Sequence, residues 1–279
     1  MWWTDMAYKR ILTIQDISCV GQCSMTVAMP ILSACGHETC ILPTALLSTH
    51  TGGFGKPSVI HLDAGLEAMW QHWKENDITF DAILVGYLGS TAAVEMTARI
   101  LSEMLAPGGI SIVDPAMADH GKLYSGFDKT YAGAMERLCR KADIILPNIT
   151  EAAMFAGMEY REKLDEDYIR QLLEKLAHPC VILTGVGYRA GETGAVVSSN
   201  GSLEYYTHPK VENNFHGTGD MFAAAFTGAL MQEKSLLDSV KIAADFVCKA
   251  IENTCAAPAH WYGVKFETAL PELIRLLQK

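Results

Sequence analysis

The feature that most constrains the fold is a repeated alternation of short β-prone runs with helix-like runs. The β-prone runs lie at 9–16, 38–42, 81–85, 109–113, 143–146 and 180–184. Helical periodicity separates them, at 25–34, 63–75, 92–105, 129–140, 150–156 and 165–176. Strand–helix–strand units of this kind build parallel sheets. We therefore predict an α/β fold with a largely parallel central sheet and helices on both faces.

The pattern changes after Gly185, where two alternating runs at 193–198 and 203–208 flank Asn200-Gly201. Asn-Gly between such runs is typical of a β-hairpin, which we expect to extend the sheet antiparallel at one edge. Helices are expected at 218–231, 236–253 and 268–277. Because no linker or repeat interrupts the pattern, residues 9–279 are predicted to form a single domain, preceded by a disordered extension at 1–8.

Composition restricts the class of ligand. The chain has 279 residues, of which 49% are hydrophobic, and a net charge of −10. An acidic protein without concentrated Lys and Arg is unsuited to nucleic acid or an anionic membrane surface, so we expect a small-molecule ligand. No signal peptide or apolar run of membrane-spanning length is evident, and the eight cysteines lack metal-site spacing. These features predict a cytoplasmic protein with free thiols and no structural metal.

Polar or small residues follow several predicted strands: Asp16, Gly86-Tyr87, Asp114-Pro115, Asn148 and Thr184-Gly185. In an open parallel sheet, ligands bind beyond the carboxyl ends of the strands. We therefore expect these separate positions to converge on one site.

The sequence Gly-Thr-Gly-Asp at 217–220 precedes a segment rich in Ala, Phe and Met. Two glycines at a helix start allow backbone N–H groups to approach an anion such as phosphate. Asp220 would repel that phosphate unless it accepts a proton from the attacking group. The alternative interpretation is an ordinary turn followed by an acid that the helix dipole favours.

Four residues near the predicted strand ends are candidate oxygen ligands for Mg²⁺, an ion that bridges carboxylates to nucleotide phosphates. They are Asp114, Asp119, Asn148 and Glu151. Each residue also has a structural interpretation. Asp114-Pro115 suits a turn, and Glu151 suits a helix cap.

A glycine-rich loop at 47–57 suits closure over a substrate. Its His50 and Thr51 could contact a ring or hydroxyl group, or could lie in solvent. Tyr87 could stack on a flat ligand or complete the core. His216 precedes the glycine loop and is a candidate phosphate contact, whereas Trp70, Trp73 and Trp261 are interpreted as packing residues.

Six motifs in order give the chain a wider resemblance. They are Ile-Gln-Asp-Ile-Ser-Cys-Val-Gly at 14–21, Leu-Ser-Thr-His-Thr-Gly-Gly-Phe-Gly at 47–55, Gly-Tyr-Leu-Gly-Ser at 86–90, Val-Asp-Pro-Ala-Met-Ala-Asp-His-Gly-Lys-Leu-Tyr at 113–124, Pro-Asn-Ile-Thr-Glu at 147–151 and Gly-Thr-Gly-Asp at 217–220. Together they resemble the ribokinase-like superfamily, and within it the pyridoxal and pyridoxamine kinases.

The resemblance implies ATP-dependent phosphorylation of the 5′-hydroxymethyl group of a vitamin B6 vitamer. It implies that Asp220 is the catalytic base and that Gly217, Thr218 and Gly219 form the anion hole. It further implies a nucleotide and metal side, with Asp114 and Glu151 as metal residues, and a pyridine-ring pocket. The nucleotide side comprises Asp114, Asp119, Tyr124, Asn148, Glu151, Thr184 and His216, and the ring pocket comprises Asp16, His50, Thr51 and Tyr87. Mg²⁺, a monovalent cation such as K⁺ and a homodimer are expected from the same resemblance.

Two departures bear on specificity. Many pyridoxal kinases have Ser where this chain has Asp16, and Met-Gly where it has Met117-Ala118. A carboxylate in the ring pocket favours a cationic aminomethyl group, which indicates pyridoxamine. The alternatives are a hydroxymethylpyrimidine kinase of thiamine synthesis, a pyridoxal phosphate-binding protein without turnover, and a carbohydrate kinase. Loop 47–55 argues against the first of these and the intact Gly-Thr-Gly-Asp against the second.

Overall fold

A computed structural model describes residues 7–211, 215–257 and 260–278. Most of the extension expected at 1–8 lies outside the described residues. Ala7, which is described, exchanges two backbone hydrogen bonds with the side-chain amide of Gln232, at 3.0 and 2.9 Å.

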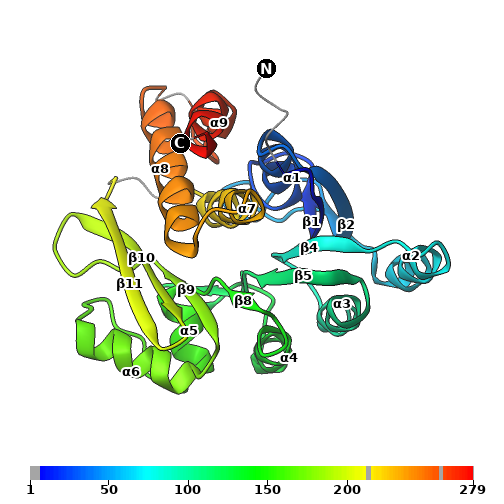
Figure 1. Ribbon diagram of the computed structural model, residues 1–279, viewed down its shortest axis with the longest axis horizontal. Helices are drawn as coiled ribbons and strands as arrows, with labels where there is room; N and C mark the ends of the chain where they lie inside the picture. Colours follow the sequence, from blue (N-terminus) through cyan, green and yellow to red (C-terminus); the bar gives the residue numbers. More distant parts are fainter. Residues whose placement is uncertain (1–6, 212–214, 258–259, 279) are drawn as a thin grey trace.

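Nine strands form one sheet in the order β11-β10-β9-β8-β5-β4-β1-β2-β3. Its six central strands are parallel: β9 (Cys180–Thr184), β8 (Ile144–Ile145), β5 (Leu105–Val113), β4 (Phe80–Val85), β1 (Arg10–Ser18) and β2 (Glu38–Leu47). All six parallel strands were predicted, and Figure 1 shows them running through the middle of the molecule.

Antiparallel strands close both edges of the sheet. β10 (Glu192–Ser199) and β11 (Ser202–Pro209) form the predicted hairpin beside β9, turning at Asn200 and Gly201. At the other edge, β3 (Val59–His61) pairs with β2. A second, two-stranded sheet pairs β6 (Ala118–Asp119) with β7 (Lys122–Leu123). The sequence did not predict β3, β6 or β7, because strands of two or three residues carry too little periodicity.

Helices cover both faces, as Figure 1 shows. One face carries α2 (Asp63–Glu75), α3 (Thr91–Glu103), α4 (Lys129–Cys139), α5 (Ile149–Phe155) and α6 (Glu166–Leu176). The other carries α1 (Met25–Ala34), α7 (Thr218–Met231), α8 (Leu236–Cys255), the 3₁₀ turn η1 (Phe266–Ala269) and α9 (Leu270–Leu277). None of the described helices has the length and apolarity needed to cross a membrane.

Each face of the sheet has its own core. Leu12 and Ile14 of β1 belong to one buried cluster, whereas Ile11 belongs to the other, as strand alternation requires. α7 is buried on most sides, with Phe226 fully enclosed, and each such side chain stabilises the fold by about 1.5–3 kcal/mol. The helix that begins at the glycine loop is therefore fixed in the core.

Some predicted boundaries were wrong. β2 was expected to end at residue 42 but continues to Leu47, past Pro43, because a proline tolerates a strand position where its missing N–H is not needed. β1 continues to Ser18, so Asp16 lies within the strand instead of at its end. A bulge between Gln15 and Ile17 interrupts the pairing with β2 there.

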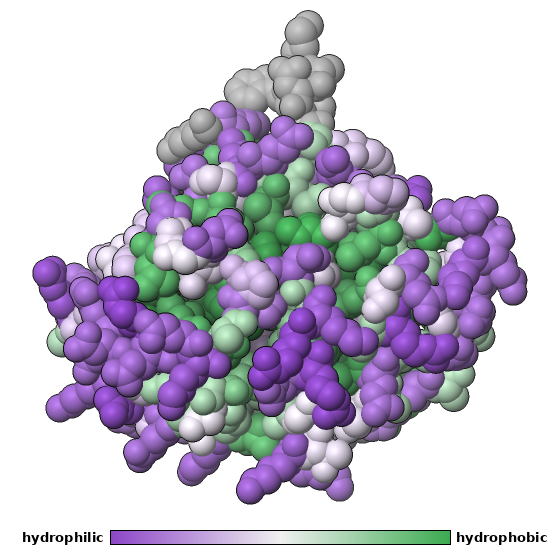
Figure 2. Space-filling model, turned by 60° about the horizontal axis from the view of Figure 1, so that its bottom comes forward, coloured by the Kyte–Doolittle hydropathy of each residue, from purple (hydrophilic) through white to green (hydrophobic). Residues whose placement is uncertain are grey.

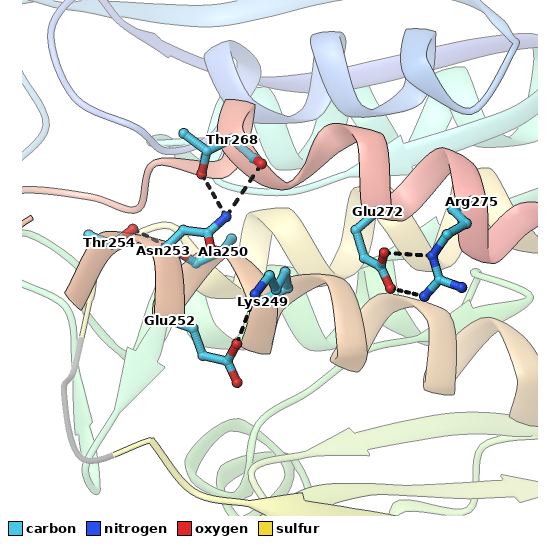
Figure 3. A network of polar contacts seen from close by, with 8 residues as sticks. All are labelled: Lys249, Ala250, Glu252, Asn253, Thr254, Thr268, Glu272 and Arg275. Atoms are coloured by element: carbon cyan, nitrogen blue, oxygen red, sulfur yellow. Dashed lines mark hydrogen bonds and ion pairs between the residues drawn. The ribbon is translucent and has the colours of Figure 1, made fainter. Parts of the chain in front are cut away.

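The C-terminal elements are tied to α8 by hydrogen bonds that Figure 3 shows in part. Asn253 Nδ2 donates to the carbonyl and hydroxyl oxygens of Thr268, at 3.3 and 3.0 Å. The Lys265 N–H donates to Thr254 Oγ1 at 2.9 Å. These three hydrogen bonds fix the chain that precedes η1.

Hydrophilic side chains cover much of the face in Figure 2, and apolar residues gather between them.

Candidate active site

The carboxyl ends of the parallel strands meet at one edge of the sheet, as the sequence predicts. The Asp16 N–H donates to the Tyr87 carbonyl at 3.1 Å, and the Asp114 N–H donates to the Val85 carbonyl at 2.9 Å. Asn148 and Thr184 form an isolated parallel bridge. Residues from β1, β4, β5, β8 and β9 therefore converge on one rim.

The glycine loop faces this rim. Gly217 is the N-cap of α7 and has a φ of +84°, a conformation that favours glycine. A Cβ at Gly217 would lie 1.9 Å from the carbonyl oxygen of Gln22, so the backbones approach too closely for any side chain. A Cβ at Gly219 would lie 3.8 Å from Asp114 Oδ2, which places the loop beside that carboxylate. The first N–H groups of α7 are thus available to an anion near Asp114.

Asp220 lies in the first turn of α7 and also meets the start of α1. Its Oδ2 accepts a hydrogen bond from the Ser24 N–H at 2.8 Å, and Ser24 is the N-cap of α1. Ser24 has a φ of 51°, a strained backbone of the kind found at functional sites. The residue is partly exposed, but the carboxylate is enclosed by protein. Burial raises its pKa from 3.8 to about 7, with a smaller upward contribution from Asp16, against the lowering effect of the Ser24 bond.

Asp16 is a second buried carboxylate in this region, with 2% of its surface exposed. Ser18 Oγ donates to its Oδ2 at 3.2 Å. Burial raises the pKa of Asp16, and hydrogen bonds from Ser24 and Ser18 partly offset that rise. The nearby Cys23 thiol has its pKa raised to about 12, first by burial and then by the charge of Asp220. Cys23 therefore stays protonated and is no nucleophile at neutral pH.

Both carboxylate oxygens of Glu151 accept hydrogen bonds from the backbone. Its Oε1 accepts from the N–H groups of Met117 and Ala118, at 2.8 and 3.3 Å, and its Oε2 accepts from the Asn148 N–H at 3.0 Å. The last bond, with Asn148 Oδ1 accepting from the Glu151 N–H, completes a capping box for α5. Burial raises the pKa of Glu151 to about 7. The carboxylate thus positions the chain leading into β6.

Asp114 offers the oxygen best placed for a cation. Its Oδ1 accepts from the Ala116 N–H at 3.1 Å, while no hydrogen bond among the described residues reaches Oδ2. Burial raises the pKa of Asp114, and the charges of Glu151 and Asp220 raise it further. These neighbouring negative charges would be offset by a divalent cation, for which Asp114 Oδ2 is one available carboxylate ligand.

The cation would need further ligands from outside the protein. Across the described ranges, no three or more His, Cys, Asp or Glu side chains gather as a metal site. Mg²⁺ matches this chemistry, because it commonly takes one or two carboxylates and completes its shell with water and phosphate oxygens.

The predicted nucleotide residues differ in how they are placed. Tyr124 is 41% exposed, and its pKa is raised by burial and then by the charges of Glu151 and Asp114, so its hydroxyl lies near both. Asp119 is exposed, and its Oδ1 accepts from the adjacent His120 N–H at 2.7 Å. Thr184 Oγ1 donates to the Pro147 carbonyl at 3.4 Å. Tyr124 is thus close to the carboxylates, whereas Asp119 bonds within its own turn.

Loop residues 48–58, here called the acceptor loop, connect β2 to β3 and carry His50. His50 is 5% exposed, and its Nδ1 accepts from the Gly52 N–H at 2.8 Å. Nε2 has no hydrogen-bond partner among the described residues. Because Nδ1 accepts, the neutral ring carries its proton on Nε2, which is therefore a buried donor without an acceptor.

The other ring-pocket candidates lie around His50 and Asp16. Thr51 is exposed on the acceptor loop. His216 lies against the same loop, with its ring centroid 4.9 Å from that of His50, so the structure brings it to this side of the rim. Tyr87 is half-buried, and burial with the charge of Asp16 raises its pKa to about 12. Its ring lies 5.3 Å from that of Phe127.

Sequence reasoning missed several residues that shape the site. Ser18 and Ser24 hold the two buried carboxylates, yet the sequence indicates only a turn there. Phe127 packs against Tyr87 and lies parallel to Tyr131 at 3.7 Å between ring centroids. The usable signal was the density of small polar residues at 18–24, since each could donate to a neighbouring carboxylate.

The fold is that of the ribokinase-like superfamily: a mostly parallel sheet covered on both faces, with a glycine-bounded helix N-terminus at the carboxyl ends of the strands. The predicted superfamily is therefore confirmed. Residues 32–264 match the family model described as phosphomethylpyrimidine kinase, and the chain belongs to this family of kinases.

Named relatives carry two kinds of activity. Hydroxymethylpyrimidine/phosphomethylpyrimidine kinase of Bacillus subtilis is 31% identical over 183 residues, 64% of this chain and 66% of that protein. The crystal structure of pyridoxal kinase from Lactobacillus plantarum has a TM-score of 0.88 at 33% identity, covering 96% of this chain and 97% of that one. A protein of Bacteroides thetaiotaomicron, provisionally assigned as a phosphomethylpyrimidine kinase and solved with pyridoxal, has a TM-score of 0.88 at 32% identity, with 95% of each chain covered.

Proposed function

We propose that the protein is an ATP-dependent kinase that phosphorylates the 5′-hydroxymethyl group of a vitamin B6 vitamer, with pyridoxamine favoured. The observation that carries this proposal is Asp220: an enclosed carboxylate with a pKa of about 7, directly after a glycine loop at the start of a buried helix. A general base works best when its pKa lies near the operating pH.

In the proposed reaction, the hydroxymethyl oxygen forms a bond to the γ-phosphorus as the bond to the β–γ bridging oxygen breaks. The hydroxyl proton passes to Asp220, and ADP leaves. The N–H groups of Gly217, Thr218 and Gly219 face the developing charge on the phosphoryl oxygens. A buried, rigid α7 keeps these donors in place without reorganisation during the reaction.

Mg²⁺ would be held by Asp114 through Oδ2, and it supplies charge neutralisation at the nucleotide phosphates. Glu151 has one remaining acceptor position on Oε2, beyond its bond to Asn148, so we propose that it binds the metal through a water molecule. Its main role is to hold the N–H groups of Met117 and Ala118, which positions the segment that leads to Tyr124.

The nucleotide is proposed to lie beside β8 and β9, where Asn148, Thr184 and Tyr124 border the carboxylates. Asp119 remains a predicted contact of the nucleotide phosphates. His216 was predicted on the nucleotide side, but its contact with the His50 ring supports a place at the mouth of the acceptor pocket.

The acceptor ring is proposed to lie among Asp16, His50, Thr51 and Tyr87. His50 presents an Nε2–H donor, which suits the ionised 3-hydroxyl oxygen of a B6 vitamer. Asp16 is a buried carboxylate whose ionised form needs a cationic partner, and the aminomethyl group of pyridoxamine provides one. Charge complementarity in this enclosed pocket supports pyridoxamine over pyridoxal.

The second candidate is hydroxymethylpyrimidine kinase, which the family description and the Bacillus subtilis relative favour. Both acceptors are flat heterocycles with a hydroxymethyl group. Only the vitamer carries the phenolic oxygen that would accept from His50. A protein that binds pyridoxal phosphate without turnover would not need a base with a pKa near 7.

The assembly and ion requirements remain proposals. We propose a single domain, a homodimer, dependence on a monovalent cation such as K⁺ and a cytoplasmic location. β3 is the edge strand of the sheet, and its Val59 is 43% exposed and its Ile60 is 59% exposed. This apolar edge suits contact with a partner subunit. The cysteines at 19, 23, 35, 40, 139, 180 and 248 carry free thiols.

The proposal is tested by a kinase assay with ATP and Mg²⁺ over pyridoxamine, pyridoxal, pyridoxine and hydroxymethylpyrimidine, with identification of the phosphorylated product. We expect 5′-phosphorylated vitamers, with the highest kcat/KM for pyridoxamine. A higher kcat/KM for hydroxymethylpyrimidine would move the assignment to the second candidate. Equal values for the three vitamers would remove the preference for pyridoxamine.

A further inference from the structure

A segment near the C-terminus lies against the acceptor loop. The Phe54 ring is 4.6 Å from the Trp261 ring and 5.1 Å from the Tyr262 ring, measured between centroids. Trp261 was interpreted as a packing residue, and it does pack on these rings, but at the surface, because 60% of it is exposed. We call Phe54, Trp261 and Tyr262 the aromatic clasp. It joins two parts of the chain about 200 residues apart, next to the proposed acceptor pocket.

The C-terminal half of the clasp is anchored to the glycine loop through Gln22. Gln22 Nε2 donates to both carboxylate oxygens of Glu267, each at 3.0 Å, and His260 Nε2 lies 3.1 Å from Gln22 Oε1. The carbonyl of the same Gln22 packs against Gly217. Residues 260–267 are therefore fixed relative to the start of α7, and the clasp has a rigid base.

Glycines let the acceptor loop approach this base. Gly53 has a φ of +83°, and a Cβ there would lie 2.8 Å from Trp261 Cζ3. A Cβ at Gly52 would lie 2.5 Å from His216 Nε2. A side chain at either position would push the loop away from the rings. The loop therefore packs closely because residues 52 and 53 have none.

The clasp reaches the proposed acceptor through His50. The Phe54 ring meets the His50 ring edge-on, with 5.2 Å between centroids. Gly52, between these two residues, donates its N–H to His50 Nδ1 at 2.8 Å and so keeps the proton on Nε2. The position of the loop thus determines both where the imidazole lies and which nitrogen carries its proton.

We propose that the aromatic clasp holds the acceptor loop over the acceptor pocket, and that Trp261 is a positioning residue that acts on the acceptor through Phe54 and His50. The identity of the acceptor as a B6 vitamer rests on the proposed function. The clasp itself rests on the contacts of the loop with Trp261 and Tyr262. Residues close to the C-terminus would then set acceptor affinity without touching the reacting atoms.

The experiment compares Trp261→Leu with Tyr8→Leu, a matched loss of an exposed aromatic outside the clasp, since Tyr8 is 73% exposed. Amide hydrogen exchange of the acceptor loop is measured without ligand, and KM and kcat are measured for pyridoxamine and for ATP. An aromatic pair corresponds to about 2- to 10-fold in an equilibrium. We expect exchange in the loop to speed up by about that factor in Trp261→Leu, and KM for pyridoxamine to rise by about the same factor.

The kinetic result separates positioning from catalysis and from general damage. In Trp261→Leu, kcat and KM for ATP should change by less than about 2-fold, because the base and the nucleotide side are untouched. Phe54→Leu should reproduce the effect and should not add to it in the double variant. If Trp261→Leu does not fold, Phe54→Leu alone provides the test.

Two outcomes would overturn the proposal: unchanged exchange of the acceptor loop in both clasp variants, or faster exchange with KM for pyridoxamine unaltered. An equal effect of Tyr8→Leu would also overturn it. If the wild-type protein phosphorylates no vitamer, the proposed function fails, and the exchange measurement still decides whether the clasp holds the loop.

Discussion

Replacing Asp220 by Asn separates the chemical role of this residue from its cost to the fold. The side chains have nearly the same shape, and the Asn carbonyl oxygen can still accept from the Ser24 N–H, as Asp220 Oδ2 does at 2.8 Å. The variant loses only the ability to take a proton and the negative charge. We therefore expect a folded protein with kcat lowered by about 10²- to 10⁴-fold, the usual contribution of a general base. The affinity for ATP should be unchanged or higher, because a like charge near the phosphates is removed.

The same change should stabilise the protein at alkaline pH. Asp220 has its pKa raised from 3.8 to about 7 in the fold, so the folded state binds its proton more tightly than the unfolded chain does. The ionised carboxylate therefore destabilises the fold increasingly as the pH rises from about 4 to about 7, and constantly above that. At 1.36 kcal/mol for each pKa unit, the full shift corresponds to about 4 kcal/mol, which partial exposure of the residue reduces to about 2–4 kcal/mol.

The assay is urea unfolding of wild type and Asp220→Asn at pH 8 and at pH 4, combined with single-turnover kinetics. The free energy of unfolding should be higher for the variant at pH 8, and most of this difference should disappear at pH 4. Near-normal kcat in the variant would refute the assignment of the base. A loss of stability at pH 8 would refute the claim that the carboxylate is enclosed at a cost to the fold.

Three further predictions concern the remaining groups. Asp16→Ser should lower kcat/KM for pyridoxamine about 5- to 10-fold relative to pyridoxal, since a charge-assisted bond exceeds a neutral one by about 1 kcal/mol. Competition assays with both vitamers measure this ratio, and an unchanged ratio would argue against Asp16 as the amine contact. Glu151→Gln should raise the Mg²⁺ concentration for half-maximal activity about 10- to 100-fold, because outer-sphere residues tune metal affinity. A Mg²⁺ titration at saturating vitamer checks this, and a normal curve would contradict it. In the free enzyme, kcat/KM should fall as pH drops below about 7, when Asp220 becomes protonated. A pH profile with no such limb would show that another group accepts the proton.

Much of the fold was accessible from the sequence because its long-range order follows from local patterns. The alternating runs predicted every central strand, and Asn200-Gly201 predicted the edge hairpin. The convergence of Asp16, Asp114 and Asn148 follows from parallel topology alone, since carboxyl ends of parallel strands share one edge.

The parts that were not predicted depend on contacts between distant residues. β6 forms where Glu151 holds the N–H groups of Met117 and Ala118, which lie more than 30 residues away and give no local signal. Trp261 is interpreted from its type as a packing residue, and only the approach of Phe54 shows that it packs against the acceptor loop. The different roles proposed for Asp114 and Glu151 likewise depend on which of their oxygens already accept hydrogen bonds from the backbone.

The most direct test of the account is a crystal structure of the protein with Mg²⁺, a non-hydrolysable ATP analogue and pyridoxamine. We predict an Asp220 carboxylate oxygen within about 2.6–3.2 Å of the 5′-hydroxyl oxygen, or one water molecule away, with that hydroxyl in line with the γ-phosphorus. An Asp220 side chain turned away from the bound alcohol, or a vitamer bound outside the rim formed by β1, β4 and β5, would contradict the account.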